Sequence, residues 1–355
     1  MTISHFHYMQ CTTKMTNGQP FIPKFFTFPN FFQIYLSGAN LISPHILKLG
    51  IIAMGGISMN HVRNIVRAAE AHRQGITGKG INIAIVDTGL SFHPDFQSRI
   101  TGWYDALKGK PSPYDDSGHG SHVAGIAAGD GHMSHGLYRG IAPEAGLIGV
   151  KVLNKKGNGT ISDIMRGLNW ILHNRERLQI RIVNISIGAN DKKTFDENCD
   201  FVKKVNLLWD AGIVVIAAAG NKGPNRQTIS APGNSRKIIT VGSSDVCGTA
   251  KEPELSHSGI GPTLSCIKKP DVVAPGSRII SCSVGSKNRH EQYYSMKSGT
   301  SMSTPIVTGA VALLLSKYPE MTPREVKIRL KNSCTDLHLP HEKQGWGLLN
   351  IAALL

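Results

Sequence analysis

The chain has 355 residues, of which 41% are hydrophobic, 18% charged and 6% aromatic. This composition excludes collagen-like, coiled-coil and disordered chains, and the sequence has no apolar run of about 18 residues that would predict a transmembrane helix. The formal net charge is +15, but the basic residues are scattered along the chain, so we expect attraction to acidic segments and no specific nucleic-acid partner.

The first 60 residues differ from the rest, because they contain no Asp or Glu and seven of the eleven Phe. They lack the basic start, early apolar stretch and cleavage site of a secretory signal peptide. Three interpretations stay open: a reduced pro-segment, a disordered extension, or a true start at Met54 or Met59. We favour the last two together. The prediction is an extension over residues 1–60 and a folded domain over 61–355.

From residue 61 onward, short apolar runs alternate with helical patterns. Runs rich in β-branched residues predict buried strands at 81–86, 147–153, 180–187, 213–218 and 238–241. Helices are predicted at 61–72, 161–173, 195–209, 303–316 and 322–333. The segment 303–316 is apolar on nearly every face, which indicates a helix in the middle of the core. The alternation predicts a doubly wound α/β fold, in which helices cover both faces of a mainly parallel sheet.

Three Gly-rich turns carry reactive side chains at the expected carboxyl edge of this sheet, where α/β proteins bind ligands. Asp87 ends the first strand, His119 precedes a helix, and Ser301 leads into the buried helix. A serine hydroxyl becomes a nucleophile when an imidazole takes its proton, and a carboxylate orients that imidazole. Backbone N–H groups at a helix start can face a developing oxyanion, and Asn221 can add an amide donor.

These turns resemble those of the subtilisin-like serine proteases, the subtilases, over about residues 62–349. The motifs are Val86-Asp87-Thr88-Gly89, His119-Gly120-Ser121-His122-Val123-Ala124-Gly125 and Gly299-Thr300-Ser301-Met302-Ser303-Thr304-Pro305. Their order, Asp then His then Ser, is that of subtilisin. The resemblance implies a three-layer fold with one peptidase domain, and a monomeric serine endopeptidase that acts on proteins or peptides without a required cofactor.

Carried over residue by residue, the resemblance makes Ser301 the nucleophile, His119 the general base and Asp87 the residue that orients it. Asn221 becomes the side-chain donor of the oxyanion hole, beside the backbone N–H of Ser301. The extended segments expected to pair with the substrate backbone contain Gly157, Asn158, Gly159, Ser186, Ile187 and Gly188. The wall of the primary specificity pocket is expected to consist of Ala218, Ala219 and Gly220.

Lys222 follows Asn221 directly and is expected near the mouth of the specificity pocket. A cation there would repel a Lys or Arg before the cleaved bond, so we expect a preference for apolar or acidic residues. The alternative is that Lys222 points into solvent and has no effect on specificity.

A structural calcium ion is left open. Many subtilases bind calcium through a loop after the His-bearing helix, and Asp95 matches one carboxylate ligand of that site. The segment 129–137, which should supply the other ligands, does not resemble the usual loop.

Two other functions compete with proteolysis. The spacing of His119, His122, His132 and His135 allows a metal site, but the sequence has no His-Glu-x-x-His motif with an activating Glu. We therefore expect His122 to be structural and no catalytic metal. The second alternative is a catalytically silent subtilase fold used for binding or regulation.

None of the six cysteines has metal-ligand spacing or the context of a cysteine nucleophile. Free thiols indicate a reducing compartment, which together with the missing signal peptide favours the cytoplasm. Secretion is the alternative, because most of the family is exported. A disulfide among Cys247, Cys266 and Cys282 also stays open.

Overall fold

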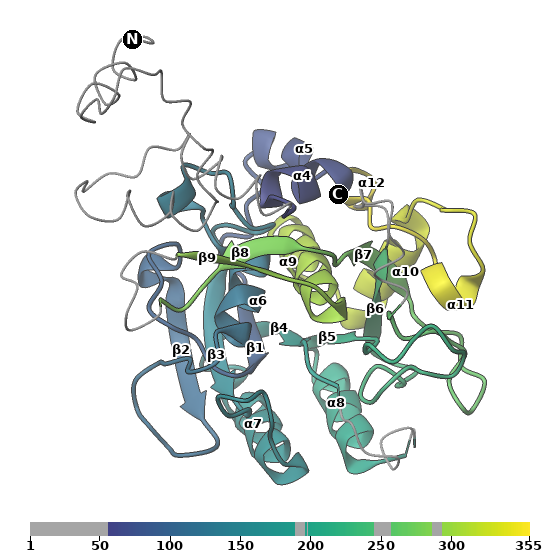
Figure 1. Cartoon of the computed structure of the whole chain (residues 1–355), viewed down its shortest axis with the longest axis horizontal. Helices are drawn as coiled ribbons and strands as arrows, with labels where there is room; N and C mark the ends of the chain where they lie inside the picture. Colours follow the sequence, from purple (N-terminus) through teal and green to yellow (C-terminus); the bar gives the residue numbers. More distant parts are fainter. Residues whose placement is uncertain (1–55, 189–195, 197, 245–256, 286–292) are drawn as a thin grey trace, which may run out of the picture. The chain divides into compact units, whose positions relative to one another are not determined.

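The computed structural model describes residues 56–188, 196, 198–244, 257–285 and 293–355 (Figure 1). The chain divides into two compact units, Met1–Ile46 and Leu47–Leu355, and every described residue belongs to the second unit. Residues 57–60 precede the boundary expected from the sequence, yet Met59 is fully buried and Ile57 pairs with Ile279. The character of residues 1–55 lies outside the described residues and stays a prediction.

A single parallel sheet contains seven of the described strands, in the order β2-β3-β1-β4-β5-β6-β7. The strands are β1 Asn82–Asp87, β2 Ile100–Asp105, β3 Gly146–Lys151, β4 Ile180–Ile185, β5 Val214–Ala218, β6 Ile239–Ser244 and β7 Val272–Pro275. Because β1 lies between β3 and β4, its last residue, Asp87, is in the middle of the carboxyl edge. The predicted mainly parallel sheet is confirmed.

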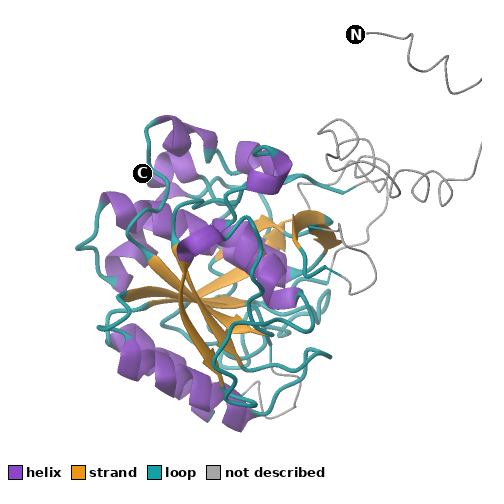
Figure 2. Ribbon diagram, turned by 90° about the vertical axis from the view of Figure 1, so that its left-hand side faces the viewer, coloured by secondary structure: helices purple, strands orange, loops and turns teal. Residues whose placement is uncertain are grey.

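Alternate residues along the central strand enter different hydrophobic clusters. Ile83 and Ile85 pack with residues of helices α6 (His119–Ala128) and α9 (Thr300–Lys317), whereas Ala84 and Val86 pack with residues of α7 (Ile161–Asn174) and α8 (Asp200–Asp210). Figure 2 shows helices on both sides of the strands. The period of two along a strand buried on both faces produces the three-layer architecture.

The helices agree in place with most of the predicted ones. They are α4 Met59–Ile65, α5 Ala69–Arg73, α6 His119–Ala128, α7 Ile161–Asn174, α8 Asp200–Asp210, α9 Thr300–Lys317, α10 Pro323–Ser333, α11 His341–Gln344 and α12 Ile351–Leu354, with short 3-10 turns η2 Gln97–Arg99 and η3 His132–Ser134. Helix α9 is buried along nearly all of its length, as predicted. No described helix is both long and apolar enough to cross a bilayer.

The continuous helix predicted at 61–72 is wrong. Arg67 has a φ of 58°, which breaks the segment into α4 and α5. The backbone carbonyl of Val66 accepts a hydrogen bond from the N–H of Ile351. The break between α4 and α5 is therefore accompanied by a contact with the C-terminal segment. Hydrophobic periodicity along the chain does not reveal such a contact.

Four described strands were missed by the hydrophobic pattern. β2 is a half-exposed edge strand with Gly102 at its centre, and β7 has only four residues. The other two, β8 Ile279–Cys282 and β9 Tyr294–Lys297, form a separate antiparallel pair, and β8 contacts α6. The four-residue strands β7, β8 and β9 are too short for an alternating hydrophobic period to be recognised.

Candidate active site

Asp87 and His119 come together where strand β1 ends and helix α6 begins. His119 Nδ1 lies 2.7 Å from Asp87 Oδ1, which also accepts the N–H of Thr88 at 2.7 Å. Asp87 is fully buried, while the His119 side chain is 27% exposed. Because a carboxylate accepts, the contact assigns the proton of a neutral His119 to Nδ1 and leaves the lone pair on Nε2.

The pKa of His119 is raised above its usual value. Burial of the ring acts in the opposite direction, since it disfavours the charged imidazolium. The negative charge of Asp87 and its hydrogen bond to the ring oppose burial, and the net shift is upward.

Asp115 holds the start of helix α6 against the turn that follows Asp87. Its Oδ1 accepts the hydroxyl of Thr88 at 2.9 Å and the N–H of Gly118 at 2.8 Å, and its Oδ2 accepts the N–H of Ser121 at 2.9 Å. The hydroxyl oxygen of Thr88 accepts the N–H of Gly120 at 2.9 Å. The turn bearing Asp87 and the helix bearing His119 are thus joined through one carboxylate. Asp115 was not singled out from the sequence, although an Asp just before a predicted helix is a common helix-start signal.

Gly120 allows the close approach of α6 to this turn. A Cβ at this position would lie 2.2 Å from the carbonyl oxygen of Gly89. Any larger residue would therefore push the helix that carries His119 away from the Asp87 turn.

Lys151 supports the same turn from the neighbouring strand, β3. Its side chain is buried, and its ammonium group donates to the carbonyl oxygens of Thr88 and of Leu153, the latter at 2.9 Å. It also donates to Asp116 at 2.7 Å. A buried ammonium group is costly unless it is paired, and these three acceptors meet that requirement. This buried lysine was not singled out from the sequence as a site residue.

Ser301 lies in the first turn of α9 and is half-buried. Its hydroxyl donates to the carbonyl oxygen of Ser186 at 2.8 Å, and the Ser186 hydroxyl donates to the carbonyl oxygen of Ser301 at 3.0 Å. This reciprocal pair joins the end of β4 to the start of α9. In this structure the Ser301 proton is directed to Ser186.

Asn221 is fixed by the residue before Ser301. Its Oδ1 accepts both the N–H and the hydroxyl of Thr300, each at 3.0 Å. The side-chain amide group of Asn221 is therefore left as a donor at the start of α9. Gly299 has a φ of 134°, and a Cβ there would lie 3.2 Å from Asn221 Nδ2, so only glycine suits this contact.

The expected substrate-binding residues follow three strands of the sheet: β3 and β4, which lie on either side of β1, and β5, which pairs with β4. Gly157–Gly159 form an exposed turn between β3 and α7, Ser186–Gly188 follow β4, and Ala218–Gly220 lie at the end of β5. Ala218 and Ala219 are buried, whereas Gly188 and Lys222 are exposed. All three segments lie at the edge that also holds Asp87, but their contact with substrate stays a prediction.

The four histidines of the alternative metal site do not gather among the described residues. His122 is fully buried, and its Nε2 lies 3.1 Å and 3.0 Å from the carbonyl oxygens of Ile279 and Ser295. Burial lowers its pKa to about 3, so the ring is neutral and Nε2–H donates to both strands of the β8–β9 pair. His132 and His135 are exposed at η3.

Cys199, Cys266, Cys282 and Cys334 are free thiols. A disulfide between Cys266 and Cys282, left open by the sequence, is therefore absent from the described residues. Cys247 lies outside them.

The chain matches the subtilase family model over residues 78–347. It is 46% identical over 291 residues to serine protease AprX of Bacillus subtilis (strain 168), covering 77% of this chain and 64% of AprX. Against subtilisin Savinase of Lederbergia lenta it is 36% identical over 288 residues, covering 81% of this chain and 95% of that enzyme. The crystal structure of a cold adapted subtilisin-like serine proteinase matches with a TM-score of 0.61 at 28% identity, over 77% of this chain and 89% of that one. The chain therefore belongs to the subtilase family of serine proteases.

Proposed function

We propose that the chain is a serine endopeptidase in which Asp87, His119 and Ser301 act as a catalytic triad. The observation that carries the proposal is the 2.7 Å contact between His119 Nδ1 and Asp87, which leaves Nε2 as the basic nitrogen. A serine in the first turn of a neighbouring helix supplies the nucleophile; α6 and α9 pack against each other. Such a combination suits acyl transfer.

In the first half of the reaction, Ser301 Oγ attacks the carbonyl carbon of the scissile peptide bond. The hydroxyl first turns away from the Ser186 carbonyl by rotation about Cα–Cβ, because one proton cannot serve both acceptors. His119 Nε2 takes that proton and then gives it to the leaving amine as the C–N bond breaks. The product is an acyl-enzyme ester on Ser301.

In the second half, His119 takes a proton from water, and the resulting hydroxide attacks the ester. The ester C–O bond breaks, the acid product leaves, and the proton returns to Ser301 Oγ. Negative charge on the substrate oxygen develops in both halves. Asn221 Nδ2 and the N–H of Ser301 are the proposed donors to this oxyanion, since Thr300 already occupies Asn221 Oδ1.

The substrate is proposed to be a protein or peptide held in an extended conformation. Backbone groups of Gly157–Gly159 and Ser186–Gly188 would pair with it as an added strand. Ala218, Ala219 and Gly220 would form the wall of the primary specificity pocket. The net charge of +15 favours substrate segments that carry Asp or Glu.

A fluorophosphonate probe tests the proposal, because it reacts with an activated serine and not with an ordinary hydroxyl. We expect the folded full-length chain to gain one adduct, and peptide mapping to place it on Ser301. Heat-denatured protein and the Ser301→Ala variant serve as unreactive controls. A folded wild-type chain without an adduct would support the alternative, a catalytically silent binding or regulatory protein.

We expect the Lys222→Glu variant to accept basic residues before the cleaved bond more readily than the wild type. Lys222 is exposed, and exposed charge pairs are worth about 0.2–1 kcal/mol, so the ratio of basic to acidic cleavage sites should rise by about 2- to 10-fold after charge reversal. Cleavage of a peptide library by both enzymes measures this ratio. Lys79→Glu, a charge reversal at an exposed residue before the amino end of β1, is the matched control. An unchanged ratio for Lys222→Glu would exclude a role for Lys222 in specificity.

We propose a cytoplasmic location, with secretion as the alternative. The supporting observation is the set of free thiols, which includes the exposed Cys266. An exposed thiol is more readily retained in a reducing compartment.

A further inference from the structure

The described segments around Asp95 offer a test of whether this chain can hold the structural calcium ion of its family. Calcium is bound by six to eight oxygen atoms that act as electron-pair donors, mostly carboxylates, carbonyls and water. In this chain the candidate ligands are the carboxylate of Asp95 and the carbonyl oxygens near the end of α6 and in the segment that follows it.

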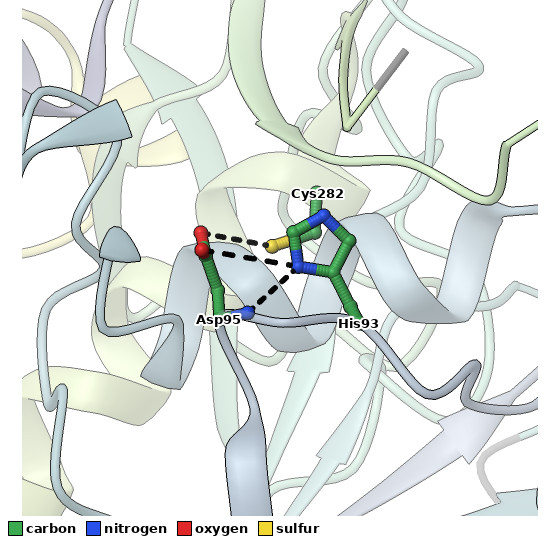
Figure 3. A group of neighbouring side chains, drawn as sticks. All are labelled: His93, Asp95 and Cys282. Carbon is green, nitrogen blue, oxygen red and sulfur yellow. Dashed lines mark hydrogen bonds and ion pairs between the residues drawn. The ribbon is translucent and has the colours of Figure 1, made fainter. Parts of the chain in front are cut away.

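The Asp95 carboxylate is already covered by proton donors. Asp95 is fully buried; its Oδ1 accepts the N–H of Met133 at 3.0 Å, and its Oδ2 accepts the hydroxyl of Tyr294 at 2.7 Å. The thiol of Cys282 lies 3.7 Å from Oδ2 (Figure 3). Each of these groups presents a hydrogen to a carboxylate oxygen that a cation would need as a ligand.

His93, Asp95 and Cys282 also form a group of the type that can bind a softer metal ion. However, His93 Nδ1 accepts the backbone N–H of Asp95 at 3.1 Å, and its Nε2 lies 2.8 Å from the carbonyl oxygen of Tyr293. Figure 3 shows these side chains turned toward one another. The group is therefore a closed hydrogen-bond network.

The nearby carbonyl oxygens are covered by the guanidinium group of Arg99. Its Nη1 donates to the carbonyl oxygens of Ala128 at 2.6 Å and Ala145 at 2.9 Å, and its Nη2 donates to the carbonyl oxygen of Asp95. The carboxylate of Asp130 lies 3.9 Å away. One cation thus joins the turn after Asp95, the end of α6 and the start of β3.

A second guanidinium group, that of Arg63 in α4, binds carbonyl oxygens of the loop that follows α6. It donates to the carbonyl oxygens of Arg139 at 2.5 Å and Gly136 at 3.3 Å, and to Asn60 Oδ1 at 3.1 Å. Burial, with help from the charge of Arg139, lowers the pKa of Arg63 to about 10, so the group is still charged at neutral pH.

We infer that Arg63 and Arg99 replace the structural calcium ion in this subtilase. Each brings a positive charge to carbonyl oxygens of this region, and each is attached to the chain, so its occupancy does not depend on ion concentration. The folded protein then has no use for calcium at Asp95, and a chelator does not lower its stability through this site. This inference concerns stability and does not rest on the proposed catalytic mechanism.

Thermal unfolding of the full-length chain tests the inference, in a Ser301→Ala background that prevents self-digestion. We expect the Tm of protein dialysed against EDTA to change by less than about 1 °C when calcium is added to 10 mM. A calcium-dependent rise in Tm that disappears in the Asp95→Asn variant would overturn the inference. A rise that persists in Asp95→Asn would come from calcium bound elsewhere and would leave Asp95 assigned to the hydrogen-bond network.

A second experiment replaces Arg99, one of the two arginines inferred to take the place of the calcium ion. Arg99→Gln removes the half-buried charge and its three carbonyl contacts and should lower the Tm by about 6 °C or more, while Arg99→Lys should restore part of the loss. Arg73→Gln is the matched control, because Arg73 is 74% exposed and pairs only with Glu70 among the described residues; its Tm should change by less than about 1 °C. If the Tm of Arg99→Gln is no lower than that of the control, Arg99 does not have the role inferred for it.

A third arm addresses the softer metal ion. Cadmium bound to a thiolate absorbs in the ultraviolet, so a titration with cadmium reports on Cys282 directly. We expect no absorption that is present in the wild type and lost in the Cys282→Ser variant. Such an absorption at one equivalent would show that His93, Asp95 and Cys282 form a metal site, which would contradict the closed network.

Discussion

Replacing Ser301 with alanine is expected to abolish peptide hydrolysis while the fold remains intact. Removing the nucleophile of a triad of this type lowers kcat by about 10⁶-fold and leaves only the activity due to binding and the oxyanion donors. The loss to the fold is small, because the Ser301 hydroxyl makes one described hydrogen bond, to the carbonyl oxygen of Ser186. Hydrolysis of a chromogenic peptide measures activity, and circular dichroism with thermal unfolding measures the fold.

Ser303→Ala is the matched control for this variant. Ser303 lies in the same helix, α9, is fully buried, and its hydroxyl has no hydrogen-bond partner among the described residues. We expect Ser303→Ala to keep kcat within about threefold of the wild-type value. Activity of Ser301→Ala at the level of this control would remove Ser301 from the mechanism.

Replacing Asp87 with asparagine is expected to lower kcat by about 10⁴-fold. The asparagine can present its amide N–H to His119 Nδ1, which would place the imidazole proton on Nε2, the nitrogen that should act as the base. Since Asp87 Oδ1 accepts from both His119 Nδ1 and the N–H of Thr88, an asparagine that directs its amide N–H to His119 also loses the hydrogen bond from Thr88. Steady-state kinetics of the two proteins on the high-pH plateau of their profiles measures the loss without interference from protonation of His119.

The pH profile provides a second measurement on the same pair of proteins. The base is the neutral imidazole, so kcat/KM rises with pH through the pKa of His119, and Asp87 contributes to raising that pKa above 6.5. The acidic limb of the wild-type profile should therefore have its midpoint above pH 6.5. In Asp87→Asn the midpoint should move to lower pH, because the negative charge that favoured the imidazolium is gone.

Asp210→Asn is the control for this pair, because Asp210 is exposed and pairs with Lys237. Its profile should coincide with that of the wild type. A limb that does not move in Asp87→Asn would show that the titrating group is not His119 held by Asp87, whatever the loss in kcat.

The regular parts of the fold follow closely from hydrophobic pattern. β1 and β3–β5 are fully or almost fully buried, so their segments are rich in apolar and β-branched residues, and α7 has a clear apolar face. The half-exposed β2 and the four-residue β7–β9 were not found. β2 and β7 pair with β3 and β6, which lie outside a local sequence window, and the short β8 and β9 pair with each other.

The chemistry of the site was also accessible from sequence, because it lies in three short motifs. Asp87, His119 and Ser301 stand at ends of elements whose type could be predicted, and residue type limits what each can do. The residues that position them were not found in this way. Asp115 and Lys151 both contact Thr88, in the turn after Asp87. The sequence alone does not reveal that this carboxylate and this ammonium group lie against the same turn.

The sequence by itself therefore determined the α/β class, the order of the reactive residues and the family resemblance, because each depends on local pattern and residue type. The tertiary structure decided which atoms meet: the proton on His119 Nδ1, the amide orientation of Asn221, and the guanidinium groups of Arg63 and Arg99 on carbonyl oxygens of the loop after α6. These contacts join residues separated by up to 79 positions, so their distances are set by packing and not by spacing in the chain.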